Sequence, residues 1–302
     1  MNRSKTTLLV TIVAALAFAA LVSPEARSQG TDKKPVVPVP ALPEFKTDDP
    51  AEHGKQIALY KDLYEQGWVD EVAQGVMTLY DAGGDSVRRT YRRMGLEDVK
   101  EGDRYLIKFM SPAEIKSVAA LTHENSGSTD DNWLYLPSNK RVRRISGANN
   151  TASFQGTEFT YEDLATLDVH EYEWRFLEET TLERGDQKIP VYKLSAKPTY
   201  KDTGYSRLVV FFHRTEWRHE RIDFYDKAGR KLKTRDVAEW RQLHGRFWRE
   251  KRIEMKNHQT GKRTVLEQSK NFLNMSLYTS KKTGKPRKNL TKDMFTTRAL
   301  EN

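Results

Sequence analysis

The feature that most constrains the fold of this chain is an alternation of side chains with a period of two residues. It begins at Val72, where two sets of side chains interleave up to Tyr80, and a Gly83-Gly84-Asp85 turn follows. Successive side chains of a β-strand point to opposite faces of a sheet, so this period indicates strands. Further strand-like segments are 87–94, 103–110, 118–122, 133–136, 141–145, 171–178, 189–194, 207–214, 220–225, 246–256 and 263–267. Many short strands separated by turns predict an antiparallel barrel or sandwich.

The first 28 residues have the pattern of an export signal. Arg3 and Lys5 form a basic start, and the apolar run from Leu8 to Val22 is shorter than the ~20 residues of a membrane-spanning helix. Ala26-Arg27-Ser28 offers small residues at the −3 and −1 positions, so we expect cleavage before Gln29 and a periplasmic protein. An uncleaved N-terminal anchor is the alternative.

Charge and cysteine content limit the chemistry of the 302-residue chain. Its formal net charge is +9, and it remains basic after removal of the signal. In an exported protein this charge suits anionic headgroups or acidic partners, or serves solubility alone. Export argues against nucleic acid as a partner. The absence of cysteine excludes disulfides, thiolate metal sites and cysteine nucleophiles.

Composition divides the remainder into three parts. Residues 29–50 contain five prolines and few apolar side chains, which predicts an extended linker. Asp49-Pro50 has the pattern of a helix start, so a helix is expected over 51–67. The β-rich domain is expected over 70–302.

The sequence lacks the common patterns of catalytic sites. It contains no Gly-x-Ser-x-Gly elbow, Walker loop or Gly-x-Gly-x-x-Gly. His219-Glu220-Arg221-Ile222-Asp223 approaches a zinc-protease motif, but Asp223 replaces the second histidine, and residues four apart on a strand lie ~13 Å apart. Carboxylates are abundant, although no pattern singles out an acid/base pair. We therefore predict no enzyme activity, no metal site and no cofactor.

The segments around residue 140 are rich in aromatic and basic side chains. Trp133–Leu136 and Arg141–Ile145 are expected to pair around a Pro-Ser-Asn turn, and Ser153–Leu164 adds further aromatics. These aromatics either fill a core or line an apolar cavity, and the residues alone do not distinguish the two. Arg141, Arg143 and Arg144 either contact phosphate or belong to a solvated strand face.

These segments resemble the core motif of the LolA-like outer-membrane lipoprotein-sorting family. The matching residues are Trp133-x-Tyr135-Leu136-Pro137, Arg141-Val142-Arg143-Arg144-Ile145, Ser153-Phe154-x-Gly156, Phe159-x-Tyr161-Glu162-Asp163-Leu164, Phe109-Met110-Ser111-Pro112, Met255-x-Asn257 and Gly261-x-x-Thr264-x-Leu266. Gly156-Thr157-Glu158 departs from the Gly-Ser-Asp common in this branch. The resemblance implies a mainly β (α+β) fold. Its core would be a highly curved antiparallel sheet or unclosed β-barrel of LolA/LolB type, with a few helices plugging the concave side.

The function implied by the resemblance is that of a periplasmic carrier or chaperone. Such a protein binds a lipid or lipoprotein acyl chain in an apolar cavity, for lipoprotein sorting or as an accessory of envelope lipid export. Each CH₂ group shielded from water contributes ~0.8 kcal/mol. Expected partners are the acyl chain and an inner-membrane export complex or outer-membrane acceptor. The expected cavity residues are Met77, Leu79, Tyr105, Ile107, Phe109, Trp133, Tyr135, Val142, Phe154, Phe159, Phe211 and Trp248. Arg141, Arg143 and Arg144 are expected to contact a headgroup or partner.

Two other functions are compatible with a β-rich exported chain. The first is a non-catalytic envelope scaffold with a filled core, which would dock on a membrane export complex through its edge strands and basic face. The second is an outer-membrane barrel, whose strands would need ~10 residues with apolar side chains facing lipid. A mean hydropathy of −0.77 disfavours the barrel.

Overall fold

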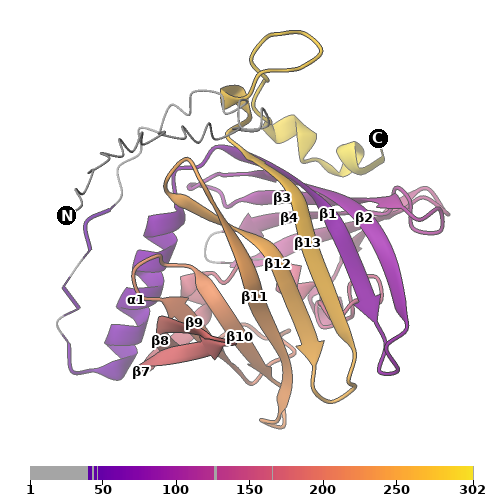
Figure 1. The fold of residues 1–302 in the computed structure, drawn as a ribbon. Coiled ribbons are helices and arrows are strands. Elements are labelled where there is room, and N and C mark those ends of the chain that lie inside the picture. Colours follow the sequence, from indigo (N-terminus) through magenta and orange to yellow (C-terminus); the bar gives the residue numbers. More distant parts are fainter. Residues whose placement is uncertain (1–39, 43, 46, 126–127, 165, 302) are drawn as a thin grey trace, which may run out of the picture. The chain divides into compact units, whose positions relative to one another are not determined.

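The fold is built on one curled antiparallel sheet. The structure is a computed structural model that describes residues 40–301 except 43, 46, 126, 127 and 165. The expected signal peptide and most of the expected linker lie outside these residues. Within the described part, 13 strands form a single sheet, shown as a ribbon in Figure 1. None of the described helices is long and apolar enough to cross a membrane.

The elements follow one another along the chain with a single α-helix at the start of the described part. The helix is α1 (Pro50–Glu65), and the strands are β1 (Asp70–Tyr80), β2 (Ser86–Leu96), β3 (Arg104–Ser111), β4 (Ala119–Asn125), β5 (Ser128–Leu136), β6 (Arg141–Ile145), β7 (Tyr172–Arg184), β8 (Gln187–Pro198), β9 (Arg207–His213), β10 (His219–Tyr225), β11 (Lys231–Leu243), β12 (Phe247–Asn257) and β13 (Arg263–Leu273). Short 3₁₀ turns are η2 (Gly147–Asn149), η3 (Glu162–Leu164), η4 (Val169–Glu171), η5 (Met275–Leu277), η6 (Lys292–Met294) and η7 (Thr297–Glu301).

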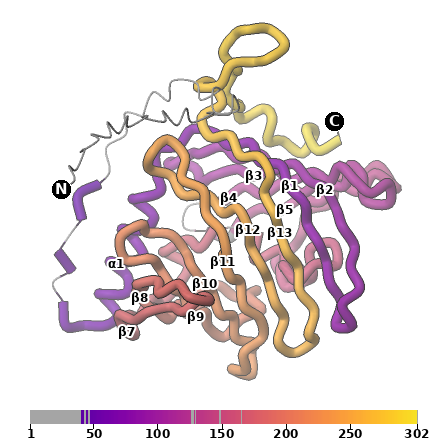
Figure 2. The backbone as a smooth tube through the Cα atoms, viewed as in Figure 1, coloured from indigo at the N-terminus to yellow at the C-terminus, as the bar shows by residue number. Residues whose placement is uncertain are grey.

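The sheet is a meander whose first and last strands are neighbours. The strand order is β6-β5-β4-β3-β2-β1-β13-β12-β11-β10-β9-β8-β7, and every pairing is antiparallel. The path can be followed along the tube in Figure 2. The two edge strands, β6 and β7, are therefore consecutive in sequence, and residues 146–171 connect one edge to the other. The predicted curved and unclosed antiparallel sheet is confirmed.

The central strand β1 shows why particular residues are required in the sheet. It pairs with β2 from Asp70↔Leu96 to Tyr80↔Ser86, and its pairing with β13 shifts register between Gln74 and Gly75. A Cβ atom at Gly75 would lie 2.4 Å from the carbonyl oxygen of Glu267, so no side chain fits at this position.

Helix α1 packs against the concave side of the sheet. Its predicted start is confirmed, because the Asp49 side chain accepts a hydrogen bond from the backbone N–H of Ala51 at 3.0 Å and Pro50 opens the helix. Ile57 is fully buried and belongs to a cluster with side chains of β7 to β10. At Gly54 the helix approaches β7 so closely that a Cβ atom would lie 2.5 Å from the Phe176 nitrogen.

The C-terminal segment covers part of the opposite, convex face. Phe295 and Leu300 are buried there against Leu121 of β4 and Tyr135 of β5. A hydrogen bond of 2.7 Å joins the His123 Nε2 to the carbonyl oxygen of Phe295. The strands β3 to β5 are therefore buried on both faces.

Candidate ligand-binding site

A cavity of about 570 Å³ opens on the concave side of the sheet. Both halves of the sheet, β1 to β6 and β7 to β13, contribute strands to the cavity wall. Strands β3 and β4 therefore face β9 and β10 across the cavity. Its apolar lining includes Met77, Ile107, Ala120, Phe154, Phe159, Leu208, Ile222, Phe224, Ile253 and Leu266. Small-molecule sites typically enclose ~300–1,000 Å³ and have mostly apolar walls. The concave side is thus partly open, because side chains of the two halves do not fill the space between them.

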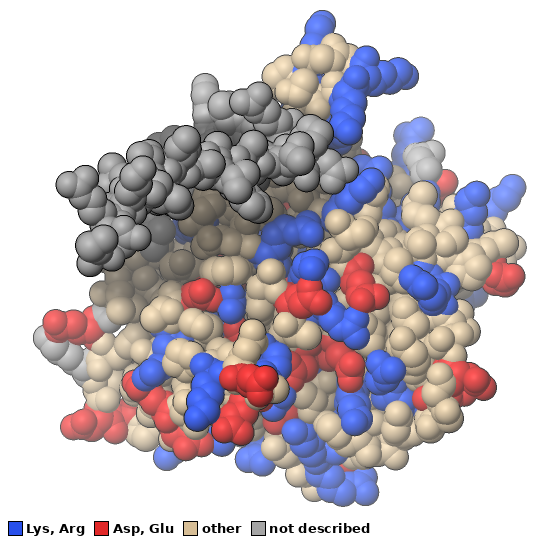
Figure 3. Space-filling view, viewed as in Figure 1, with Lys and Arg blue, Asp and Glu red and all other residues tan. Residues whose placement is uncertain are grey.

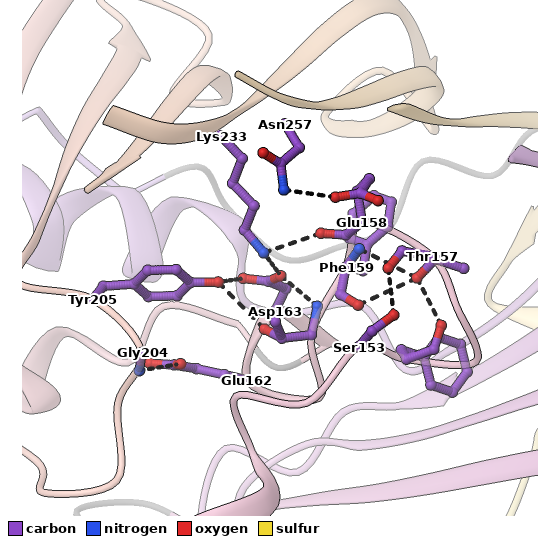
Figure 4. A network of polar contacts seen from close by, with 12 residues as sticks. Ser153, Thr157, Glu158, Phe159, Glu162, Asp163, Gly204, Tyr205, Lys233 and Asn257 are labelled. Atoms are coloured by element: carbon purple, nitrogen blue, oxygen red, sulfur yellow. Dashed lines mark hydrogen bonds and ion pairs between the residues drawn. The ribbon is translucent and has the colours of Figure 1, made fainter. Parts of the chain in front are cut away.

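The segment that joins the two edge strands forms one wall of this cavity. Phe154 and Phe159 line it, and they are held by a compact turn shown in Figure 4. In this turn the Phe154 N–H donates to the Phe159 carbonyl at 2.7 Å, the Thr157 hydroxyl donates to the Phe154 carbonyl at 2.7 Å, and the Ser153 hydroxyl donates to the Thr157 carbonyl at 2.6 Å. The Ser153–Leu164 motif is therefore a folded insert within the curled sheet.

A buried ion pair fixes this insert to the sheet. Lys233 of β11 pairs with Asp163, and their side chains are 3% and 2% exposed. The same ammonium donates to the Glu158 carbonyl at 3.1 Å, and the Tyr205 hydroxyl donates to the Asp163 carboxylate at 2.7 Å. The Asn257 amide of β12 donates to the Glu158 carboxylate at 2.8 Å (Figure 4). These contacts tie the insert to strands β11 and β12 and to Tyr205, just before β9.

Acidic side chains gather at one side of the cavity. Glu97, Asp103, Glu124, Asp130 and Asp168 all line it. Burial raises the pKa of Glu124 to about 8, and the nearby charge of Asp103 adds to this shift. Burial also raises the pKa of Asp130 to about 7 and that of Glu97 to about 7. Within the described residues no three histidine or acidic side chains are arranged to hold a metal ion.

A second polar region, which we call the polar belt, consists of Glu71, Arg93, Arg235, Arg249 and Glu250. All five line the cavity, from strands β1, β2, β11 and β12. Glu71 accepts from Arg249 at 3.3 Å and from Arg93 at 3.5 Å, while Arg235 pairs with Glu250. The charged groups of the belt therefore have partners of opposite sign.

Half of the cavity residues expected from the sequence lie on the cavity wall. These are Met77, Tyr105, Ile107, Phe154, Phe159 and Trp248. Leu79 and Phe109 occupy the same face, but they pack into the apolar cluster beside Met77 and do not reach the open space. Phe109 is fully buried and fills the core.

The other four expected residues lie on the convex side, which corrects the prediction. Trp133, Tyr135 and Val142 pack beneath the C-terminal segment, in the cluster of Phe295. Phe211 belongs to a separate cluster with Leu182, Ile189 and Val191 of the β7–β8 hairpin. Alternation assigns residues to two faces but does not identify the concave one, and an aromatic residue suits either face when both are covered.

The three expected headgroup arginines lie on the edge strand β6, away from the cavity wall. Arg141, Arg143 and Arg144 are exposed, and Arg144 pairs with Asp131 of β5. The cations that do line the cavity include Arg93, Arg235 and Arg249, which sequence analysis did not select. The sequence signal that could have identified Arg93 as a cavity residue is its position two residues after Tyr91, on the same face of the strand.

The chain is similar to proteins of known structure over most of its length. A family model described as an uncharacterized protein matches residues 101–302. The chain is 34% identical to a domain provisionally assigned to outer-membrane lipoprotein sorting from Vibrio parahaemolyticus, with a TM-score of 0.74 over 83% of this chain and 100% of that one. It is 26% identical to a DUF1329 family protein from Desulfovibrio piger, with a TM-score of 0.72 over 83% and 99%. A LolA superfamily protein from Nitrosomonas europaea, 17% identical, shares the fold with a TM-score of 0.58 over 80% and 97%. No curated protein matches the chain.

Proposed function

Because this chain belongs to the LolA-like outer-membrane lipoprotein-sorting family, we propose that it is a periplasmic carrier for the acyl chain of a lipid or lipoprotein. The chain would enter the concave cavity and contact the apolar wall, including Met77, Ile107, Phe154 and Phe159. The function is binding and release, without bond chemistry. Its donor would be an inner-membrane export complex, and its acceptor the outer membrane.

The observation that supports this proposal is the open space of about 570 Å³ between the two halves of the sheet. A scaffold stabilised by a filled core has no need for such a space, since packing it would add stability. Transfer of twelve methylene groups from water to an apolar wall contributes ~10 kcal/mol before the costs of binding are subtracted. This is enough to hold an acyl chain that would otherwise be exposed to the aqueous periplasm.

A matched pair of substitutions tests the cavity directly. Ala120 lines the cavity, whereas Ala238 of β11 is exposed. In Ala120→Phe the new ring occupies space in the cavity that would otherwise hold about two methylene groups of the bound acyl chain. The binding free energy should then fall by ~1.6 kcal/mol, which is about fifteenfold in affinity. Ala238→Phe adds the same ring outside the cavity and should leave affinity unchanged.

The measurement is uptake of a fatty acid, a phospholipid and a lipopeptide by delipidated protein, followed by native mass spectrometry and titration calorimetry. We expect stoichiometric binding by the wild-type protein and by Ala238→Phe. Absence of uptake of all three ligands by the folded wild-type protein would refute the carrier function and favour the envelope scaffold. Equal affinity of Ala120→Phe and wild type would place the ligand elsewhere.

A further inference from the structure

The capacity of the cavity can be compared with the volume of an acyl chain. A methylene group occupies roughly the volume that one water molecule takes up in the liquid, ~30 Å³. The cavity of about 570 Å³ therefore has room for ~19 such groups, which corresponds to one acyl chain of roughly 16 to 18 carbons. Two chains of 16 carbons would need ~960 Å³, which is well beyond the available space.

Only one end of this space is apolar, as two neighbouring strands of the wall show. In order from one end, the cavity-lining residues are Asp103, just before β3, then Tyr105 and Ile107 of β3, and alongside them Glu124, Thr122 and Ala120 of β4. Ile107 pairs directly with Ala120, so the two strands change from acidic to apolar at the same level. Both belong to the cluster of Phe154, which places the apolar end against the insert. At ~3.3 Å per residue the change takes ~13 Å, and a second acyl chain would have to lie along the acidic end.

The insert, which forms one wall, cannot move outward without loss of buried contacts. Its Asp163 is paired with Lys233, as described above. In addition, the Glu158 N–H donates to the hydroxyl of Thr264, a buried residue of β13, at 3.0 Å. Displacement of the insert would leave these groups without partners inside the protein, which is unfavourable.

Helix α1 lines the cavity with its last turn and is fixed in a similar way. The carbonyl oxygens of Tyr64 and Gln66 accept hydrogen bonds of 2.9 and 2.8 Å from the guanidinium of Arg246, a buried residue. The segment after the insert is tied to β4, because the Thr166 N–H donates to the Glu124 carboxylate at 2.8 Å. The cavity therefore keeps its size unless several of these contacts are broken together.

We propose that the cavity encloses a single acyl chain, with the methyl end of the chain against the insert. Its ligands are then single-chain amphiphiles, such as a lysophospholipid or a peptide that carries one acyl group. A lipid with two or three long chains would leave at least one of them in water. This inference rests on the proposed carrier function and narrows the class of ligand.

The first test lets ligands with different numbers of chains compete for the wild-type protein. Delipidated protein is incubated to equilibrium with phosphatidylcholine vesicles that carry equal small amounts of palmitoyl lysophosphatidylethanolamine, dipalmitoyl phosphatidylethanolamine, and one peptide in monopalmitoylated and tripalmitoylated form. Native mass spectrometry then identifies the bound ligands. Exposure of only four methylene groups disfavours a ligand by more than about a hundredfold, so we expect the single-chain ligands to exceed the others by at least this factor. Their ratio to each other distinguishes a phospholipid from a peptide source.

The second test measures the capacity with the matched pair Ala120→Phe and Ala238→Phe. Lysophosphatidylethanolamines of 12 to 24 carbons should show an upper limit of chain length near ~19 carbons in the wild type. In Ala120→Phe this limit should be about two carbons lower, because the ring takes the space of about two methylene groups. Ala238→Phe should keep the wild-type limit, and thermal unfolding checks that both variants are folded.

The outcomes separate this inference from the carrier function. Binding of two-chain or three-chain ligands in amounts equal to the single-chain ligands would overturn the inference while the carrier function stands. So would the absence of an upper limit of chain length, or the same limit in folded Ala120→Phe and in the wild type. Uptake of no ligand by the wild type would instead count against the carrier function.

Discussion

At the scale of single residues, the Lys233–Asp163 pair has the clearest energetic role. It joins the insert, which forms one wall of the cavity, to strand β11. Both side chains are almost fully buried. Removal of one partner of such a pair leaves an uncompensated charge in a poorly solvated site. This typically costs ~3–5 kcal/mol, whereas an exposed pair contributes ~0–1 kcal/mol.

We therefore expect Asp163→Ala to lower the free energy of unfolding by ~3–5 kcal/mol. The matched control is Glu173→Ala, which breaks an ion pair with Lys197 whose two side chains are 65% and 64% exposed, and which should cost less than ~1 kcal/mol. Urea unfolding measures both, with the slope of the transition showing whether the unfolded reference has changed. Equal effects of the two substitutions would show that the insert is not held by this pair.

Residue roles at the site were only partly predictable from the sequence. Phe154 and Phe159 were selected as cavity residues and do line the cavity, because their motif is recognisable as a unit. Arg93, Arg235 and Arg249 also line the cavity and were not selected, since nothing in a local pattern shows which charged side chains face the concave side. That property depends on strands brought together by the whole sheet.

At the scale of elements, the segment after β13 contains a projecting loop with concentrated positive charge. Lys281, Lys282, Lys285, Arg287 and Lys288 are all exposed, and none forms an ion pair among the described residues. The loop is narrow at its base, where the Ser280 N–H donates to the Lys285 carbonyl at 2.8 Å. It extends from the top of the view in Figure 1, and its basic surface appears blue in Figure 3.

This loop should attract anionic membranes. A cation near an anionic lipid surface contributes ~1 kcal/mol, so replacing the four lysines of the loop by glutamine should weaken binding to vesicles with 30% anionic lipid by at least about tenfold. The control replaces four exposed lysines elsewhere, Lys100, Lys116, Lys140 and Lys188, and changes the net charge equally. Cosedimentation at low and high salt is the measurement, because ions shorten the range of the attraction. Equal loss in both variants would show that net charge, and not the loop, governs the attraction.

Most strands were predictable as elements, and β11 is the exception. The expected pairing of β5 with β6 is confirmed. β11 escaped prediction because it carries Arg235 and Trp240 on the cavity wall, and Lys233 paired with Asp163 of the insert, in place of a run of aliphatic residues. When the inward-facing side chains of a strand are polar, the alternation of apolar and polar residues that strand prediction depends on is lost. A strand that contributes to the polar lining of the site is thus the one that the sequence pattern does not reveal.

At the scale of the whole molecule, the acidic side of the cavity makes stability depend on pH. The folded protein raises the pKa of Glu124 from 4.5 to about 8 and that of Asp130 from 3.8 to about 7, in both cases chiefly through burial. The folded state therefore holds these protons more tightly than the unfolded state does. Between pH of about 4 and 8 the unfolded chain loses them first, so the free energy of unfolding should fall as pH rises.

Glu124→Gln should remove part of this dependence. The glutamine carbonyl can still accept the hydrogen bond that Glu124 receives from the Thr166 N–H at 2.8 Å, but no charge forms beside Asp103 and Asp130. We expect Tm to rise by about 2–4 °C at pH 8.5 for each kcal/mol recovered and to change little at pH 4. Glu114→Gln, at an exposed loop position, is the control. A Tm increase of the same size at both pH values would contradict the proposed ionisation.

The pairing of β1 with β13 determines when the curled sheet, and with it the cavity, is complete. A polypeptide that leaves a ribosome or a translocation pore from its N-terminus displays β1 with only one neighbour until residue 273 has followed. Contacts between segments so distant in sequence form late. The sheet is incomplete while the chain is still threaded, so under the proposed carrier function the acyl group would be handed over only after release, and a stalled or truncated chain would have no cavity to receive it.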